Sequence, residues 1–232
     1  PVFPMNFKDP ESDEIWKGYK ESGYFPEAFI NMTALLGWTP ANDREIVSMA
    51  EMITEFDLHK VHKAGARFDP QKAKWFNQEY LKTKSNEEVL DLLKEVEEVK
   101  TLNLSDDKLL KIVSLMKERV TFVIDIYNDG KFLFEAPTSY DEKALKKAWN
   151  DTTSAILKDF VAKLETSEFD SETLKDAIHH FAEEHSLGMG KVMMPLRLAL
   201  VGELKGPDVP DIMNIIGKEE TLERIEKAIS SN

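Results

Sequence analysis

Two arginines lie among apolar residues, an unusual setting for a side chain that is always charged. Arg119 lies in the most apolar helix-forming stretch of the chain, and Arg197 lies in the apolar run from Met194 to Gly202. A guanidinium in such surroundings extends to solvent, pairs with an acid or points into a functional cleft. Glu118 and Asp125 are close enough in sequence to pair with Arg119, so a structural ion pair and a ligand-binding role both remain open.

Histidines could hold a metal, and three of them are clustered. His179, His180 and His185 fall on one predicted helix. Helical metal sites favour a spacing of four residues, which places two imidazoles on one face. The offsets of five and six splay these rings apart, so we expect His185 on the apolar face and the other two at the surface. A metal-dependent helical enzyme stays open as an alternative, and elemental analysis would test it.

A basic segment over residues 58–84 stands out in an acidic chain. The chain of 232 residues has a formal charge of −13, which by itself opposes a nucleic-acid partner. The segment nevertheless has a net charge of +5, and two readings remain: a solvated helix face or a set of phosphate contacts. Its seven cations are Lys60, Lys63, Arg67, Lys72, Lys74, Lys82 and Lys84.

Signatures of catalysis are missing from the sequence. It has no cysteine, which excludes disulfides and thiolate chemistry, and it shows neither a nucleophile elbow nor a Gly-rich phosphate loop. Carboxylates are spread over predicted helix surfaces, so no acid–base pair can be nominated. We therefore predict no catalytic residue and no metal or cofactor site in this chain. No apolar run is long enough to span a membrane, and a cytoplasmic protein fits the composition.

The elements that position these residues are predicted to be helices. Strand-type alternation is scarce and glycine and proline are few, so we predict an all-α fold. Pro26 is suited to a first helical residue and Gly37 to a terminator, and Asp69 with Pro70 suits a helix start. One buried helix is predicted over 109–127. Capping boxes are predicted at Ser48 with Glu51, Ser85 with Glu88, and Ser139 with Glu142.

Breaks near 84–85 and 136–139 divide the chain into three helical modules. The predicted boundaries are 1–84, 85–139 and 140–232. We expect these modules in an elongated arrangement.

Several separate motifs resemble bacterial glutamyl-tRNA synthetases, in the same order along nearly the whole chain. The resemblance begins just after the second ATP-binding signature of these class I enzymes. Neither that signature, Lys-Met-Ser-Lys-Ser, nor the first, His-Ile-Gly-His, occurs here. Besides residues 1–7, the matching segments are 23–31 (GYFPEAFIN), 34–38 (ALLGW), 56–58 (FDL), 65–70 (GARFDP), 74–77 (KWFN), 191–203 (KVMMPLRLALVGE), 206–207 (GP), 216–219 (IGKE) and 222–225 (LERI).

The resemblance implies a stem-contact module over 1–84 and two anticodon-binding modules over 85–139 and 140–232. Arg119 then falls where discriminating members place an arginine facing the third anticodon base. Arg197 falls at the arginine that meets the first base, and Pro207 and Val209 fall in the loop that packs against it. Gly206 departs from the hydroxyl residue that some members carry, which puts a side-chain contact there in doubt.

The implied partners are tRNA(Glu) and an N-terminal catalytic domain, with ATP and Mg²⁺ used by the full-length enzyme and not by this chain. Lys60, Lys63, Arg67, Lys72 and Lys74 become the candidate contacts to the tRNA backbone. A cytoplasmic monomer without a membrane partner is expected. The alternative function is a helical protein-interaction module with no RNA partner, which salt-dependent binding to cognate but not non-cognate tRNA would distinguish.

Overall fold

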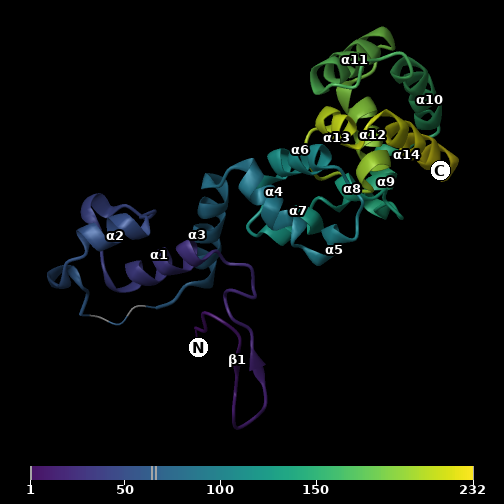
Figure 1. Ribbon diagram of the computed structural model, residues 1–232. Coiled ribbons are helices and arrows are strands. Elements are labelled where there is room, and N and C mark those ends of the chain that lie inside the picture. Colours follow the sequence, from purple (N-terminus) through teal and green to yellow (C-terminus); the bar gives the residue numbers. More distant parts are fainter. Residues whose placement is uncertain (1, 64, 66, 232) are drawn as a thin grey trace. The chain divides into compact units, whose positions relative to one another are not determined.

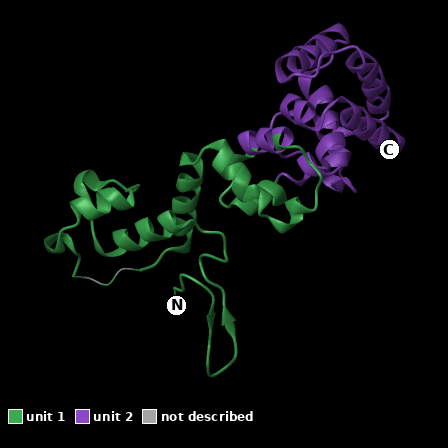
Figure 2. Cartoon of the chain, viewed as in Figure 1, with its two compact units in different colours: residues 1–106, 116–129 green, residues 107–115, 130–232 purple. Residues whose placement is uncertain are grey.

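The structure is a computed structural model that describes residues 2–63, 65 and 67–231. Pro1 and Ala66, which belong to two of the motifs above, lie outside the described residues. The chain forms two compact units: unit 1 holds residues 1–106 and 116–129, and unit 2 holds 107–115 and 130–232 (Figure 2). These two units do not coincide with the three modules predicted from sequence, whose boundaries stay a prediction.

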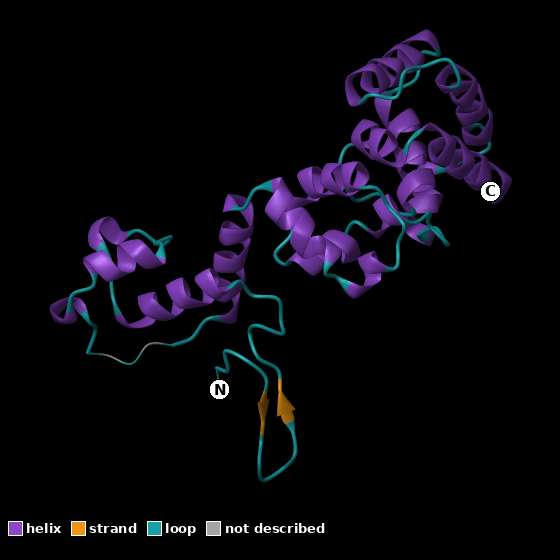
Figure 3. Cartoon of the chain, in the orientation of Figure 1, coloured by secondary structure: helices purple, strands orange, loops and turns teal. Residues whose placement is uncertain are grey.

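The all-α prediction is confirmed, with one small sheet added near the N-terminus (Figures 1 and 3). Strands β1 (Phe7–Lys8) and β2 (Ile15–Trp16) form an antiparallel hairpin in which Phe7 opposes Trp16. Strands of two residues carry no readable alternation, which is why the sequence did not reveal them.

Unit 1 contains short helices that follow the hairpin. They are α1 (Pro26–Gly37), η1 (Ala41–Asp43), α2 (Met49–Glu55), η2 (Leu58–Lys60), α3 (Pro70–Thr83), α4 (Asn86–Lys94), α5 (Glu97–Lys100), η3 (Lys117–Arg119) and α7 (Val123–Asn128), where η marks a 3₁₀ turn.

Unit 2 contains most of α6 and the remaining helices. They are α6 (Asp106–Met116), α8 (Lys131–Phe134), α9 (Glu142–Ala148), α10 (Thr153–Leu164), α11 (Ser171–Glu184), α12 (Met189–Val201), α13 (Val209–Ile216) and α14 (Lys218–Ser231). None of the helices in the described residues is both long and apolar enough to cross a membrane.

Most of the predicted helix starts are confirmed. Pro26 and Pro70 each occupy the first turn of their helix, and the Asp69 carboxylate accepts a hydrogen bond from the Gln71 amide at 2.8 Å. Ser48 and Ser85 close capping boxes with the glutamates three residues later. In each box the serine oxygen and the glutamate carboxylate accept from amides that the helix leaves unpaired.

Two predictions about helices are wrong. Ser139 does not cap α9, because the helix begins later and the Asp141 carboxylate accepts from the Ala144 amide at 2.7 Å. The single helix over 109–127 is instead α6, the turn η3 and α7. Helical geometry ends at Val120, which is extended, and the buried side chains of Met116 and Val120 continue the apolar pattern across this break.

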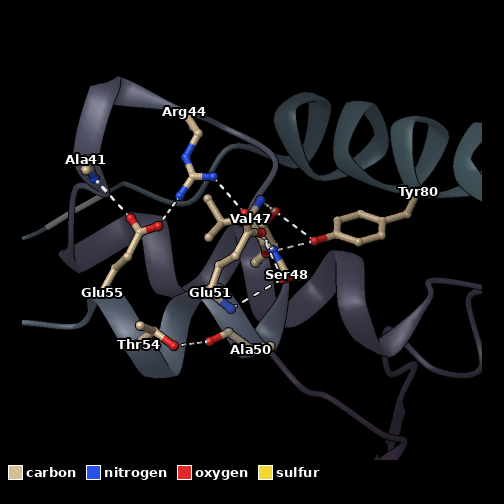
Figure 4. A network of polar contacts seen from close by, with 10 residues as sticks. Ala41, Arg44, Val47, Ser48, Ala50, Glu51, Thr54, Glu55 and Tyr80 are labelled. Atoms are coloured by element: carbon tan, nitrogen blue, oxygen red, sulfur yellow. Dashed lines mark hydrogen bonds and ion pairs between the residues drawn. The ribbon is translucent and has the colours of Figure 1, made fainter.

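Each unit has a core of its own. In unit 1, α1 packs on α3, and Trp38, Val47 and Met52 form a small cluster. A polar network supports that cluster (Figure 4): Arg44 pairs with Glu51 at 2.7 Å and with Glu55, while the Tyr80 hydroxyl donates to the Val47 carbonyl. In unit 2, α10, α12 and α14 pack together, so the helix that carries Arg197 lies at the centre of that unit's core.

Candidate nucleic-acid interface

Arg119 lies on the exposed turn η3 in unit 1. Among the residues that the structure describes, its guanidinium has neither an ion pair nor a hydrogen bond. Asp125 is engaged elsewhere, since its carboxylate accepts from the Phe122 amide at 2.9 Å. The sequence left open a structural ion pair with Glu118 or Asp125, and neither pair forms. The five donors of Arg119 are therefore available to an external acceptor.

The turn that presents Arg119 is anchored on both sides. Met116 and Val120 flank it and are buried. The side chain of Asn77, wholly buried on α3, donates to the Thr121 carbonyl at 2.7 Å and accepts from the Phe25 amide at 2.8 Å. The buried amide thereby joins α1, α3 and the Arg119 turn. An arginine on a fixed backbone loses less conformational freedom when it binds a ligand.

Arg197 has a different setting in unit 2. It is half-buried on α12, and its guanidinium donates to the Pro207 carbonyl. The neighbouring Gly206 has φ of +132°, and a Cβ there would lie 3.4 Å from Nη1 of Arg197 and 3.5 Å from the Phe132 ring. Those distances are ordinary van der Waals contacts, so it is the backbone conformation that favours glycine at this position.

Pro207 and Val209, predicted to lie in the loop beside Arg197, have different positions. Pro207 is in the loop and contacts Arg197 through its carbonyl, while its side chain is buried. Val209 is not in the loop: it is the first residue of α13 and its side chain is fully buried. Its side chain thus packs in the core, where apolar burial holds the loop end in place.

Arg224 was not predicted as a site residue, although it lies in one of the segments that carried the resemblance. This arginine of α14 is only 3% exposed and donates to the carbonyls of Phe132 at 2.6 Å and Leu200 at 2.8 Å, and to Glu220 at 2.7 Å. Leu200 lies in the last turn of α12, where carbonyls lack helical partners. Arg224 therefore positions the helix that carries Arg197.

The basic segment separates into two groups. Lys72 pairs with Glu45 and lies over the Trp75 ring at 4.0 Å, while Lys82 pairs with Glu79 at 2.7 Å and Lys84 with Glu27 at 3.4 Å. The other four cations are exposed and have no acidic partner in the described part of the chain. These four, which we call the open cations, are Lys60, Lys63, Arg67 and Lys74.

The histidines do not converge on a metal site. Within residues 2–63, 65 and 67–231, no group of three or more His, Asp or Glu side chains is placed to hold a metal ion. His185 directly follows α11 and is exposed; its ring is tilted by 32° against that of Phe181, with centroids 4.1 Å apart, and its Nδ1 lies 2.9 Å from the Phe181 carbonyl. His179 and His180 are exposed, and His179 lines a cavity of about 130 Å³.

Two protein-family models match parts of this chain. The family model described as "Anticodon binding domain" matches residues 87–229, and the one described as "tRNA synthetases class I (E and Q), catalytic domain" matches residues 12–75.

Similar proteins cover the whole chain. A glutamate–tRNA ligase of Christiangramia forsetii is 45% identical over 232 residues, which are 100% of this chain and 46% of that protein. A crystal structure of a glutamate tRNA ligase from Elizabethkingia meningosepticum, in complex with its amino acid, is 61% identical with a TM-score of 0.96. The alignment covers 100% of this chain and 46% of that one. A crystal structure of the glutamate-tRNA synthetase from Elizabethkingia anophelis is also 61% identical, with a TM-score of 0.91. That alignment covers 99% of this chain and 46% of the other. The chain thus spans about half the length of the relatives it matches.

Proposed function

Because this chain belongs to the anticodon-binding domain family and is similar throughout to glutamate–tRNA ligases, we propose that it binds tRNA(Glu) and reads its anticodon within a ligase of that kind. The observation that carries this proposal is Arg119, an exposed guanidinium without a partner in the described residues, held on an anchored turn. An RNA loop offers splayed bases whose edges such a group can read.

Arg119 would read the third anticodon base by its donors alone. The glutamate anticodon ends in cytosine, whose Watson–Crick edge offers the acceptors O2 and N3. The glutamine anticodon ends in guanine, which presents N1–H and N2–H there. A guanidinium cannot accept a hydrogen bond or lose its proton at working pH. Arg119 therefore attracts cytosine and opposes guanine, so one residue both selects and rejects.

In the same proposal, Arg197 and the open cations contact parts of the RNA other than the third anticodon base. Arg197, held against the Pro207 carbonyl, meets the first base. The open cations contact backbone phosphates, which hold the RNA without reading its sequence. The acidic remainder of the chain repels RNA elsewhere and favours the specific contacts.

The full-length protein would be a cytoplasmic, monomeric ligase that uses ATP with Mg²⁺ in its catalytic domain. This chain lacks both ATP-binding signatures, so we expect no exchange of pyrophosphate into ATP by this chain alone. Apolar exposure in unit 1 supports a packing partner there: Met5, which is 60% exposed, lines a mostly apolar cavity of about 340 Å³, and Ile15 on β2 is 69% exposed. Surface of this kind marks an interaction site.

A binding assay tests the proposal. The chain is titrated with tRNA(Glu) and with versions that carry each of the other bases at the third anticodon position, at several salt concentrations. We expect tightest binding with cytosine and a fall in affinity as salt rises. Equal binding of all versions would overturn the anticodon-reading role. Absence of any salt-dependent binding would overturn RNA binding itself and favour the protein-interaction module.

A further inference from the structure

The turn that carries Arg119 is too short to hold itself in place. It is η3, a single 3₁₀ turn of three residues, and the chain is extended directly after it, at Val120. Hydrogen bonds of a 3₁₀ turn have poorer geometry than those of an α-helix, and such turns occur mostly as connectors between other elements. The direction in which Arg119 points therefore depends on the groups of unit 1 that hold this turn.

One of these groups is the side chain of Asn77, whose two ends are bonded in opposite senses. Its Oδ1 accepts from the Phe25 amide at 2.8 Å, and its Nδ2 donates to the Thr121 carbonyl at 2.7 Å. If the carboxamide were reversed, two donors would face each other at Phe25 and two acceptors at Thr121, so only one orientation satisfies both contacts. The amide of Phe25, just before α1, thus fixes the donor that holds Thr121, two residues after Arg119.

Two further contacts hold the turn at its ends. At its beginning, Lys117 donates to the carbonyl of Lys84 at 2.8 Å, where α3 has ended and helical partners are lacking. After the turn, the ring of Phe122 meets the ring of Tyr24 edge-on, with centroids 4.9 Å apart, which is a favoured geometry for aromatic pairs. The contact made by Asn77 differs from both, because its side chain is wholly buried.

Loss of the Asn77 donor would displace the backbone near Arg119. A main-chain carbonyl that is withdrawn from water requires a hydrogen-bond partner, so the half-buried Thr121 peptide would rotate towards solvent to regain one. That rotation changes the backbone two residues after Arg119. A base contact needs heavy atoms within about 2.7–3.2 Å of one another. A small displacement of the turn is therefore enough to break it.

We infer that Asn77 is a positioning residue for the reading of the third anticodon base. Its side chain is wholly buried and cannot itself touch RNA, but it holds the turn so that the Arg119 guanidinium reaches the base at one distance. A fixed guanidinium bonds to cytosine and opposes guanine, whereas one on a loosened turn binds cytosine more weakly and can move away from guanine. Asn77 therefore affects the preference between these bases more than the total affinity for RNA. The inference deepens the proposed function and rests on it.

A second buried asparagine of unit 1 provides a matched control for Asn77. Asn31 on α1 is also wholly buried, and its Oδ1 accepts from the Val47 amide at 2.9 Å and from the Tyr80 hydroxyl at 2.9 Å. Neither partner belongs to the turn or to the residues that flank it. Asn31→Ala and Asn77→Ala each remove two hydrogen bonds from a buried carboxamide, so they should cost similar stability. Only the bonds of Asn77 hold the turn that presents Arg119.

The test measures binding of tRNA(Glu) and of its version with guanine at the third anticodon position. The chain is compared with Asn77→Ala, Asn31→Ala and Arg119→Gln, and with the double variant Asn77→Ala/Arg119→Gln. We expect Asn77→Ala to lower the cytosine-to-guanine binding ratio about five- to thirtyfold, the equilibrium factor for fixing the backbone of one residue. Asn31→Ala should lower the melting temperature as Asn77→Ala does and leave the ratio unchanged. In the Arg119→Gln chain, Asn77→Ala should lower the ratio no further, because it acts through Arg119.

Lys117→Met is a milder second variant, which decides the question if Asn77→Ala does not fold. It removes the donor to the Lys84 carbonyl and should lower the ratio about two- to tenfold, the value of one hydrogen bond. Lys82→Met, which removes the same charge from a lysine paired with Glu79, is its control and should leave the ratio unchanged. An unchanged ratio in the deciding variant, or a further fall in the double variant, would leave Asn77 with a structural role only and overturn the inference. If the unmodified chain does not prefer cytosine, the proposed function itself fails, and the inference fails with it.

Discussion

Arg119 and Arg197 look alike in the sequence, since each is an arginine among apolar residues, but the structure gives them different settings. Arg119 is exposed on a 3₁₀ turn of unit 1 and has no bonded partner among the described residues. Arg197 is half-buried on a central helix of unit 2 and donates to the Pro207 carbonyl. The apolar neighbours of Arg119 bury themselves and leave it outside, whereas those of Arg197 enclose it.

This difference predicts that changes at Arg119 alter ligand preference, whereas changes at Arg197 alter folding as well. A side chain with no internal partner can be changed with little loss of folding free energy, so its effects appear in ligand preference. A side chain that holds a loop carbonyl contributes to folding and to binding at once. Arg224 is a third case with a purely structural role, because it is buried and donates to two main-chain carbonyls.

The largest expected effect is on folding, from Arg224→Met. The variant leaves the buried carbonyls of Phe132 and Leu200 without their donor, and each unsatisfied buried group costs about 1–3 kcal/mol. We expect unit 2 to lose about 3 kcal/mol of unfolding free energy in urea titrations. Arg119→Met is the control and should change it by less than about 0.5 kcal/mol. Equal unfolding midpoints for the two variants would remove the distinction between these arginines.

Next in size is the change of base preference in Arg119→Gln. Glutamine adds an acceptor and removes the charge, so guanine becomes tolerated at the third anticodon position. A good bidentate base contact is worth about 1–3 kcal/mol, so the cytosine-to-guanine binding ratio should fall about five- to 150-fold. The melting temperature should not change. An unaltered ratio would contradict the role given to Arg119.

Arg197→Gln provides the contrast to that variant. Its side chain is bonded to the Pro207 carbonyl, so we expect weaker binding of all RNAs together with a lower melting temperature. If Arg197→Gln affected only base preference and left the melting temperature unchanged, the two arginines would be equivalent after all.

A smaller effect on the salt dependence of RNA binding should distinguish the open cations from the paired lysines of the basic segment. Replacing Lys60, Lys63 and Lys74 by alanine removes three open cations, and each phosphate contact contributes about 0.7–0.9 to the slope of log affinity against log salt. We expect the slope to flatten by about 2 and the anticodon preference to persist. The triple replacement of Lys72, Lys82 and Lys84, whose charges are paired internally, should flatten it less. Equal slopes for both triples and the unmodified chain would identify the segment as a solvated face.

The smallest expected effect is a pH dependence of stability that arises at the capping boxes of α2 and α4. Hydrogen bonds from the Ser48 amide and hydroxyl, with a further one from Arg44, lower the pKa of Glu51 to about 2 from its usual 4.5. Because the folded-state pKa is the lower one, Glu51 stabilises unit 1 above about pH 4.5, and this stabilisation is lost as the pH falls towards 2. Melting temperatures of Glu51→Gln should fall less steeply over that range than those of the unmodified chain.

The matched variant for Glu51 lies in the second capping box. Hydrogen bonds from Ser85 lower the pKa of Glu88 in the same sense, so Glu88→Gln should also flatten the acid limb. Glu226→Gln, which lies outside both boxes, is the control and should leave the acid limb as it is. A steeper acid limb in Glu51→Gln would reverse the sign of this argument.

Local signals in the sequence predicted much of the helical framework. Pro26, Asp69 with Pro70, and the boxes at Ser48 and Ser85 were found because a helix start is decided by the few residues that satisfy its free amides. The same logic failed at Ser139, because Asp141, two residues later, caps the helix instead by accepting from the Ala144 amide. The all-α class and the family resemblance likewise follow from sequence alone.

Tertiary structure decided what local patterns could not. Apolar residues over 109–127 read as one helix because composition does not reveal where a chain turns, and the turn at η3 depends on the buried side chains around it. Whether a cation is paired also depends on distant residues, such as Glu45 for Lys72 and Glu27 for Lys84. The sequence determined which residues could read an anticodon base, through the donors and acceptors they carry. Only the folded chain decided which of them face outward without a partner, because burial and pairing arise from segments that meet in space and not along the chain.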